Sequence, residues 1–337
     1  MHTRINKDNT QKKTVLFCGP IENPINSGRY MIAGMKQLGY TVVEYDYRTN
    51  KKYEKDLLTL VEKNKPLYIL ILKGEKLSPA LIEHFKASGC ITILCFTMSQ
   101  IEDWMVPFAK AHDFVITNVE SHLDYFSQRG VKNIKWIHQG FSPEFFGIDG
   151  TQICNNEKHY ADIAMIGSMG NPIYRKRCEL LMKLRRNNFD IKWWGPHLSR
   201  QLKNIRYFLG GVNRAWMGKE VYMKDFTDVV QHTKIFIGQD SDIPCQGKYL
   251  SNRSFAVMGC GGFYLCRRTP GVEFAYRVGK EIDVFDTSDE MVDKVLYYLR
   301  NEDKRKRIAL AGQKKVLSHH SYKKQMGKIF NWVNEHL

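Results

Sequence analysis

The sequence of 337 residues lacks both a long apolar run and a Cys-x-x-Cys pair. A membrane-spanning helix needs about 18 consecutive apolar residues or more, and no stretch approaches that length. VLFC, the apolar stretch that follows the basic N-terminus, is too short for the core of a secretory signal peptide. We therefore expect a cytoplasmic protein without a transmembrane segment.

Eight cysteines are scattered along the chain. Several lie in strand-like apolar runs such as TVLFC and ITILC, where buried thiols are common. We interpret them as reduced, structural residues.

Acidic residues are outnumbered by basic ones, 35 to 51, which gives a formal net charge of +16. Such an excess favours partners that carry negative charge, such as nucleotide phosphates, DNA or an anionic membrane surface. Basic residues gather at 175–192, 200–219 and 304–328. Solvated helix faces explain these clusters equally well, so the charge alone does not select the partner.

The chain is long enough for two domains, because a single hydrophobic core stops growing at about 250 to 300 residues. From residue 14, short β-rich runs alternate with longer amphipathic stretches, which indicates parallel sheets covered by helices on both faces. A polar stretch at 142–158 interrupts this alternation, which then restarts at ADIAMIG. The sequence therefore predicts an α/β protein with two similar units, followed by two C-terminal helices.

The stretch SNRSFAVMGCGGFYL combines a helix start, an apolar helix and a glycine-rich stop before a strand. Ser251 and Asn252 can cap the helix, whose free N–H groups and positive dipole end favour a diphosphate. Arg253 adds a bidentate phosphate donor at the same place. A capped helix without a ligand would show the same pattern, so both interpretations stay open at this point.

Several motifs occur in the order found in a known family: DIAMIGS, WWG, KIFIG, SNRSFAVMGCGGFYL, TPGVEF, GKEIDVF and DEMVDKVLYYLRN. Together they resemble the C-terminal domain of CgeB-like glycosyltransferases, a family named from a spore maturation protein. The resemblance covers about residues 160–333 and is looser in the N-terminal half, where LYILILKG and GVKNIKWIHQGFSPEFF carry it.

The resemblance implies a GT-B-like fold, in which two Rossmann-type domains face each other across a cleft. Residues 1–150 would form the acceptor domain and 151–320 the donor domain, and the helix at 321–337 would pack back on the acceptor domain. It implies transfer of a sugar from a nucleotide-diphosphate sugar, a UDP-sugar above others, to a cell-surface glycan, a protein or a lipid-linked glycan. Beyond this co-substrate, no cofactor or metal is expected.

Carried over by position, the resemblance assigns roles to individual residues. Gly167, Ser168 and Gly195 would lie in loops of the donor site, with Arg175 on the helix after the first loop. The diphosphate would be surrounded by Lys248, Ser251, Asn252 and Arg253. The donor sugar would lie beside Pro270, Gly271 and Glu273. Cationic side chains, here Arg253, Lys248 and Arg175, would stabilise the leaving diphosphate in place of a metal ion.

Two positions depart from the family pattern. Ala256 and Lys248 stand where related enzymes often have glutamates, the first of them a ribose ligand. Ala256 cannot accept hydrogen bonds from a ribose diol. Either other groups hold the ribose, or the donor differs, or the site is degenerate.

The identity of a general base stays open. His138, which follows a predicted strand of the first domain, is the first candidate for deprotonating the acceptor in an inverting enzyme, ahead of Glu102 and Asp103. A lone histidine is often structural, and a retaining enzyme needs no such base. The sequence does not select between inversion and retention.

Other features keep rival functions open. Asp240-Ser241-Asp242 has the spacing of a metal-binding DxD motif, although a short acidic pattern arises easily by chance. The aromatic residues of 193–216 alternate with basic ones and either pack inward or bind nucleic acid, as in a phage-type DNA glycosyltransferase acting on a modified base. A catalytically inactive sugar-nucleotide or glycan-binding protein and a sugar-nucleotide epimerase are further alternatives.

Overall fold

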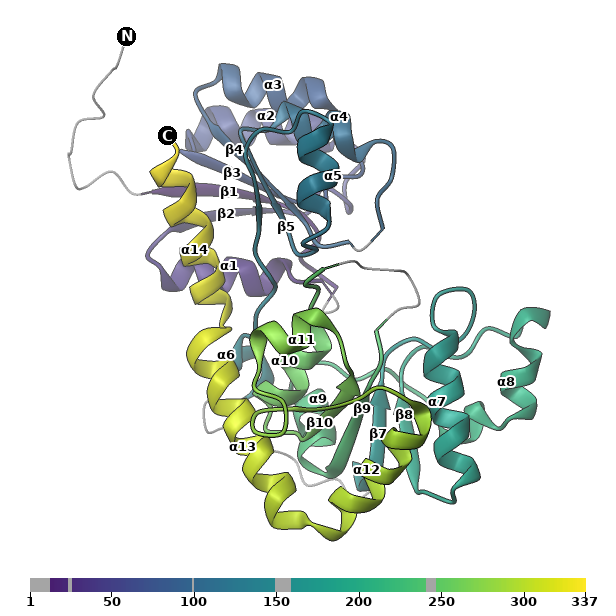
Figure 1. Ribbon diagram of the computed structural model, residues 1–337. Coiled ribbons are helices and arrows are strands. Elements are labelled where there is room, and N and C mark those ends of the chain that lie inside the picture. Colours follow the sequence, from purple (N-terminus) through teal and green to yellow (C-terminus); the bar gives the residue numbers. More distant parts are fainter. Residues whose placement is uncertain (1–12, 24–25, 99, 149–158, 241–246) are drawn as a thin grey trace.

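The computed structural model describes residues 13–23, 26–98, 100–148, 159–240 and 247–337. Two parallel sheets lie one above the other in Figure 1, each with helices on both faces. The predicted boundary between residues 150 and 151 falls outside the described residues, so the exact division of the chain stays a prediction.

The N-terminal sheet has six strands that pair in parallel throughout. In spatial order they are β2 (Thr41–Tyr45), β1 (Thr14–Cys18), β3 (Tyr68–Leu72), β4 (Ile91–Phe96), β5 (Phe114–Thr117) and β6 (Ile134–Trp136). The helices of this half are α1 (Gly28–Gln37), α2 (Tyr53–Asn64), α3 (Pro79–Ala87), α4 (Met105–Ala111), α5 (His122–Gln128) and α6 (Pro143–Phe146).

The C-terminal sheet has five parallel strands. In spatial order they are β11 (Asp283–Phe285), β10 (Tyr264–Arg267), β9 (Thr233–Gly238), β7 (Ala161–Ile166) and β8 (Ile191–Trp194). Its helices and 3-10 turns are α7 (Arg175–Arg186), η2 (Leu202–Asn204), α8 (Ile205–Leu209), η3 (Val212–Ala215), α9 (Met223–Gln231), α10 (Asn252–Gly259), α11 (Pro270–Ala275) and α12 (Ser288–Arg300).

Each sheet reverses its strand order beside its first strand, between β1 and β3 in one and between β7 and β9 in the other. In doubly wound sheets such a reversal opens a crevice at the carboxyl ends of the strands, where ligands bind. The prediction of two Rossmann-like units with a GT-B-like arrangement is confirmed. The crevice between β7 and β9 is where the candidate site lies.

Local sequence signals mark both ends of α3. The Ser78 hydroxyl accepts a hydrogen bond from the Leu81 amide at 3.3 Å, and Pro79 occupies the first helical position. Gly89 has φ +81°, the left-handed conformation that ends many helices. The short helices α4, α6, α8 and α11 are not among the elements that the apolar periodicity predicts.

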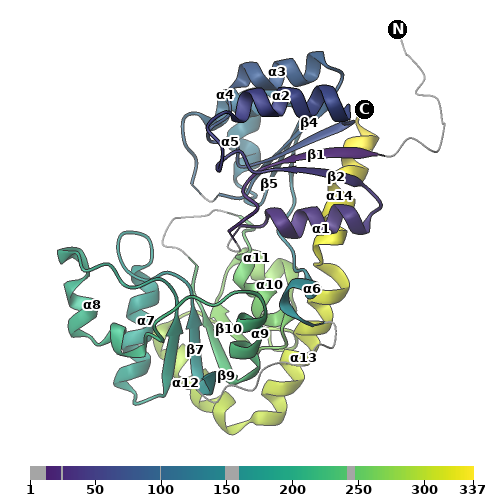
Figure 2. The same cartoon turned by 180° about the vertical axis from the view of Figure 1, so that it is seen from behind.

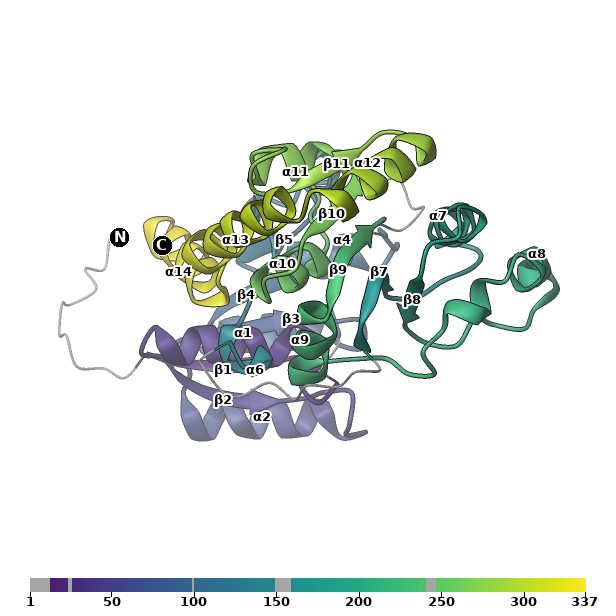
Figure 3. The same ribbon diagram turned by 90° about the horizontal axis from the view of Figure 1, so that it is seen from below.

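The chain ends in two helices, α13 (Glu302–His319) and α14 (Tyr322–Glu335), which run along one side of both sheets (Figures 1 and 3). α13 packs on α10 of the C-terminal domain, and α14 packs on α1 of the N-terminal domain. Figure 2 shows the C-terminus beside the first sheet. The prediction that the last helix crosses back to the first domain is confirmed.

Aromatic packing and one close backbone approach hold α14 in place. Phe330 stacks on Tyr40 with ring centroids 4.3 Å apart, and the Tyr68 hydroxyl donates to Oδ1 of Asn334 at 2.6 Å. A Cβ added at Gly34 of α1 would lie 2.9 Å from the backbone of Tyr322. The two helices therefore approach more closely than a side chain at position 34 would permit.

The apolar core continues from one domain into the other. Separate buried clusters cover the outer face of each sheet. A third cluster includes Tyr68 of the first sheet, Phe330 of α14, and Phe255 and Met258 of α10. Burial of apolar surface thus links the two domains.

The cysteines and helices of the described residues agree with the sequence-based expectations. Six cysteines, Cys18, Cys90, Cys95, Cys178, Cys260 and Cys266, are free and buried; Cys154 and Cys245 lie outside the described residues. Within the described residues, every helix is too short or too polar to span a lipid bilayer.

Replacing Phe330 by alanine tests the role of α14. Phe330 is 1% exposed, so Phe330→Ala should lower the free energy of unfolding by about 3–5 kcal/mol, because it leaves a cavity in the shared core. Phe274→Ala is the matched control, since Phe274 is 56% exposed and its loss should cost about 1 kcal/mol or less. Denaturant unfolding measures both. Equal losses of unfolding free energy in the two variants would contradict a stabilising role for the packing of α14 on the first domain.

Candidate functional site

A cavity of about 400 Å³ lies between the two domains, at the carboxyl edge of the C-terminal sheet. The N-terminal half contributes Tyr30, Gln139 and Phe146 to its wall. Six of the residues predicted to bind the donor also line it: Gly167, Ser168, Gly195, Ser251, Asn252 and Arg253. The volume is within the range of about 300–1,000 Å³ that is usual for small-molecule sites.

Two arginine side chains meet at the base of this cavity. Nε of Arg177 donates to the Gln239 carbonyl at 2.6 Å, and Nη1 of Arg253 donates to the same oxygen at 3.3 Å. Nη1 of Arg177 also donates to the Ser168 carbonyl at 2.9 Å. Burial, together with the neighbouring charge of Arg253, lowers the pKa of Arg177 to about 9, which still leaves it protonated at neutral pH.

Asp240 supplies the negative charge beside these cations. Burial raises the pKa of its carboxyl group, while the charges of Arg253 and Arg177 and a hydrogen bond from Ser251 act in the opposite direction. At the base of the cavity, two guanidinium groups stand beside the one carboxylate of Asp240, whereas Glu220, the other acidic residue that lines the cavity, is exposed. The base of the cavity is therefore electrostatically suited to an anion.

The first turn of α10 faces the same cavity. The Ser251 hydroxyl caps the helix by accepting a hydrogen bond from the Arg253 amide at 3.4 Å. Asn252 and Arg253, the first two residues of the helix, both line the cavity. The positive end of the helix dipole therefore adds to the charge of the two guanidinium groups.

Two glycines allow the loops after β7 and β8 to approach the arginines. A Cβ added at Gly167, which has φ +122°, would lie 2.7 Å from Nη2 of Arg253 and 3.2 Å from Nη1 of Arg177. A Cβ added at Gly195 would lie 2.3 Å from the Gly167 carbonyl oxygen. Any larger residue at position 167 would occupy the space of the guanidinium groups.

Lys248 connects the two domains. Its ammonium group donates to Oε1 of Glu120 at 2.7 Å and its amide donates to Oε2 of the same residue at 2.9 Å. These hydrogen bonds lower the pKa of Glu120. Lys248 is absent from the wall of the cavity, whereas its neighbour Tyr249 lines it.

Arg175 and Arg177 occupy different faces of α7. Arg177 is 6% exposed and shares the buried face with Leu180, Leu181 and Leu184, whereas Arg175 is exposed. The sequence-based assignment named Arg175 and missed Arg177. The spacing of Arg177 to the three leucines, at three, four and seven residues, is the signal that places it on the inward face.

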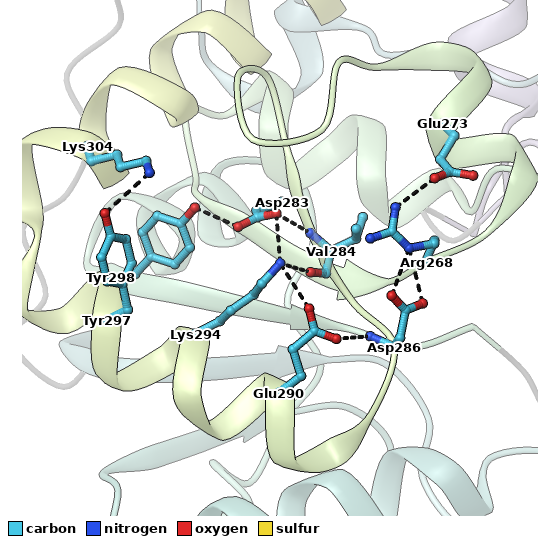
Figure 4. Close-up of polar contacts among 10 residues, drawn as sticks. All are labelled: Arg268, Glu273, Asp283, Val284, Asp286, Glu290, Lys294, Tyr297, Tyr298 and Lys304. Carbon is cyan, nitrogen blue, oxygen red and sulfur yellow. Dashed lines mark hydrogen bonds and ion pairs between the residues drawn. The ribbon is translucent and has the colours of Figure 1, made fainter.

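The three residues expected beside the donor sugar lie in α11, outside the wall of the cavity. Figure 4 shows the Glu273 carboxylate bonded to Arg268, at 2.7 Å, while Arg268 also binds Asp286. Pro270 occupies the first position of α11. A Cβ added at Gly271 would lie 2.1 Å from the Tyr249 carbonyl, so α11 packs tightly on the segment that leads to Ser251.

His138 lies beneath the cavity and does not line it. Its Nδ1 lies 2.6 Å from the Gln139 carbonyl oxygen, and its Nε2 lies 3.2 Å from Nδ1 of His320, at the break between α13 and α14. The ring stacks on Phe255 of α10 at a centroid distance of 5.2 Å. Burial lowers the pKa of His138 to about 4 and that of His320 to about 3.

Most aromatic residues of the segment 193–216 point inward. Trp193, Trp194 and Tyr207 are at most 1% exposed, and the Trp193 and Trp216 indoles donate to the Gly167 and Gly195 carbonyls at 2.7 and 2.8 Å. These tryptophans therefore fix the glycine loops. Trp194 also lines the cavity.

Of the Asp240-Ser241-Asp242 motif, the structure describes the first residue. Asp240 lies beside the two arginines, whereas Ser241 and Asp242 lie outside the described residues. Among the described residues, no group of three or more His, Cys, Asp or Glu side chains is arranged to hold a metal ion.

Part of the sequence and the fold as a whole are similar to those of known glycosyltransferases. Residues 175–331, from α7 into α14, match a protein-family model described as glycosyl transferase-like. No curated protein matches the sequence at a significant level.

Solved structures share the fold over nearly the whole chain. HepE from Anabaena, in complex with UDP and glucose, is 11% identical with a TM-score of 0.63, covering 96% of this chain and 100% of HepE. A glycosyltransferase from Rickettsia africae is 13% identical with a TM-score of 0.68, covering 96% and 98%. Sucrose-phosphate synthase from Thermosynechococcus elongatus is 10% identical with a TM-score of 0.67, covering 96% and 100%. At these identities the likeness shows the fold, and the closer resemblance to CgeB-like enzymes stays a prediction.

The buried imidazoles predict a loss of stability at acidic pH. His138 and His320 stay neutral in the folded protein, whereas in the unfolded chain they gain protons below 6.5, the ordinary pKa of histidine. The stabilisation is therefore complete above pH 6.5 and should fall by about 1.4 kcal/mol per pH unit for each imidazole as the pH drops towards 4. Denaturant unfolding at several pH values measures this slope. His320→Gln should make the slope shallower than in the unmodified protein, and parallel curves would contradict the assignment.

Proposed function

We propose that the protein is a glycosyltransferase that moves a sugar from a nucleotide-diphosphate sugar to an acceptor. One observation carries the proposal: two arginines, Arg177 and Arg253, meet at the first turn of α10 inside a cavity between two Rossmann-like domains. The glycosyl transferase-like match over residues 175–331 supports it.

The chemistry of transfer follows from this charge arrangement. As the bond between the sugar and the diphosphate breaks, negative charge develops on the leaving diphosphate. Guanidinium groups and helix N–H groups that already face this position stabilise the developing charge without reorganisation. Arg253 and Arg177 take this role, and the negative charge of Asp240 offsets part of their mutual repulsion.

The proposed donor is a UDP-sugar. HepE, which shares the fold, has been solved with UDP and with UDP-glucose. In the present chain, the apolar side chains of Trp194, Val221 and Phe226 line the cavity and offer a surface for a base. Ala256 also lines it and offers no hydrogen-bond acceptor to the ribose. Glu220, on the same wall, is the carboxylate that we assign to the ribose hydroxyls.

The acceptor would enter from the N-terminal side, where Tyr30, Gln139 and Phe146 line the cavity. A cell-surface glycan, a protein or a lipid-linked glycan is proposed as the acceptor class. Neither inversion nor retention is assigned.

Ala256 supports a second candidate function, a sugar-nucleotide-binding protein without transfer activity. The two candidates differ in donor turnover. A transferase slowly hydrolyses its donor when no acceptor is present, whereas a binding protein leaves the donor intact. Thermal unfolding with UDP, GDP, dTDP and their sugars identifies the ligand first, because a ligand bound to the folded state raises the melting temperature. Hydrolysis of the selected donor then decides between the two candidates.

Arginine substitutions test the diphosphate site. Arg253→Ala should weaken UDP binding by about 1.5–3 kcal/mol, the range for a hydrogen bond to a charged group. Arg175→Ala is the matched control, because Arg175 is an exposed arginine one helix away; its effect should be about 0.5 kcal/mol or less. Titration calorimetry measures both. Unchanged UDP affinity in a folded Arg253→Ala variant would exclude this site. A large loss of UDP affinity in Arg175→Ala would instead place the diphosphate at the exposed face of α7.

Chelation tests how the leaving group is stabilised. Because cationic side chains and the α10 terminus face the proposed diphosphate position, donor turnover should persist in excess EDTA. The measurement is the rate of UDP release with and without EDTA. Loss of activity in EDTA that Mg²⁺ or Mn²⁺ restores, together with inactivity of Asp242→Ala, would show a metal-dependent mechanism instead.

A further inference from the structure

The segment that contains η2 and α8 projects from the C-terminal domain in all three views (Figures 1, 2 and 3). Its side chains Leu202, Ile205 and Leu209 are 86%, 54% and 83% exposed. Leu202 and Leu209 are the two most exposed large apolar side chains of the described residues. Spaced three and then four residues apart, the three lie on one face of the helical turn.

The opposite face of the same turn is fixed to the protein. Tyr207 is fully buried and Asn204 is 1% exposed. Oδ1 of Asn204 accepts a hydrogen bond from the Asn171 amide at 2.9 Å, and its Nδ2 donates to the Ser199 carbonyl at 2.9 Å. The apolar face therefore points to solvent because the inward face is occupied by ordered contacts, not because the segment lacks them.

The segment that carries this apolar face is rich in basic residues. The stretch from residue 191 to residue 219 contains six Lys or Arg residues and no Asp or Glu. Arg185 of α7 and Arg214 both lie beside Gly211, just after α8: a Cβ added there would be 3.3 Å from Nε of Arg185 and 3.6 Å from Cδ of Arg214. Arg206, the basic residue of α8, is paired with Glu179 at 2.9 Å. Lys203 of η2 and Arg200 just before it are exposed.

Exposed apolar side chains beside basic residues are a combination that binds the surface of an anionic bilayer. Apolar side chains enter the boundary between headgroups and acyl chains, and Lys and Arg contact the anionic headgroups. A nucleic acid would use the charge and gain little from exposed leucines, whereas a protein partner would use the leucines and require acidic residues of its own.

We propose that the segment 199–214 docks the protein on an anionic membrane surface, with Leu202, Ile205 and Leu209 inserted between the lipid headgroups. The attachment is peripheral and reversible. It involves no residue of the proposed diphosphate site and does not rest on the proposed transferase activity.

Sedimentation with lipid vesicles tests the proposal on the full-length protein. Vesicles of phosphatidylcholine alone are compared with vesicles in which about one third of the lipid is phosphatidylglycerol. The protein should bind the anionic vesicles, and higher salt should weaken binding without abolishing it, because the apolar part of the interaction is not screened.

Two variants and one control separate the apolar and charged contributions. Leu202→Ser with Leu209→Ser should weaken vesicle binding about tenfold or more, since insertion of the two side chains is lost. Arg200→Gln with Lys203→Gln should weaken it roughly tenfold. Leu310→Ser is the matched control, because Leu310 is 68% exposed but lies on α13, and it should bind like the unmodified protein. All variants should keep their melting temperature and UDP affinity.

Four outcomes would overturn the proposal. The first is failure of the protein to bind anionic vesicles, and the second is equal binding by the double-leucine variant. The third is an equal loss in Leu310→Ser, which would place the contact on α13. The fourth is another use of the surface in the absence of vesicle binding. A leucine-dependent dimer in sedimentation velocity would assign the surface to self-association, and leucine-independent binding to duplex DNA would assign it to nucleic acid.

Discussion

Two arginine side chains that donate to one carbonyl oxygen, that of Gln239, are the interaction around which the C-terminal half is organised. Placing like charges together in a partly dehydrated site is unfavourable unless the surroundings compensate. Asp240 supplies part of the compensation, and the absence of a side chain at Gly167 supplies the space. Among the described residues, the other acidic residue that lines the cavity is Glu220, which is exposed. An anion that enters the cavity therefore meets two guanidinium groups with one carboxylate beside them.

The helix that carries one of these arginines also fixes the position of the other domain. The first turn of α10 faces the cavity, and Phe255, one turn later, stacks on His138 of the N-terminal half. His138 in turn contacts His320 at the break between α13 and α14. On the other side of the cavity, Lys248 and Glu120 join the domains through two hydrogen bonds. A movement of the first domain would therefore shift α10 and the segment after Lys248, which border the proposed phosphate position.

The regular elements of the fold could be predicted because apolar periodicity and end signals agree along most of the chain, as at Ser78 and Gly89. The short helices α4, α6, α8 and α11 are not predicted because each spans fewer than two full turns, which is too short for a clear helical periodicity. For the candidate site, a local pattern predicts the capped start of α10, and the resemblance to CgeB-like enzymes implies the glycine loops. The pairing of Lys248 with Glu120 depends on residues 128 positions apart, and His138 with His320 on residues 182 apart. No local pattern carries such information. Arg177 is a different case, because its position on the inward face of α7 is readable from the leucine spacing. The family resemblance instead assigns the role to Arg175.

The contact between α1 and α14 has a consequence for how the protein is made. α1 leaves the ribosome long before α14, yet Gly34 of one packs against the backbone of Tyr322 of the other. Domains usually fold one after another as they are synthesised. Here the first sheet emerges with only part of one face covered by α1, and Tyr68 and Phe114 await Phe330 and Trp332, which later cover them. The nascent chain therefore carries an uncovered apolar surface throughout translation of its second half, and the first domain is completed only after the second has been made.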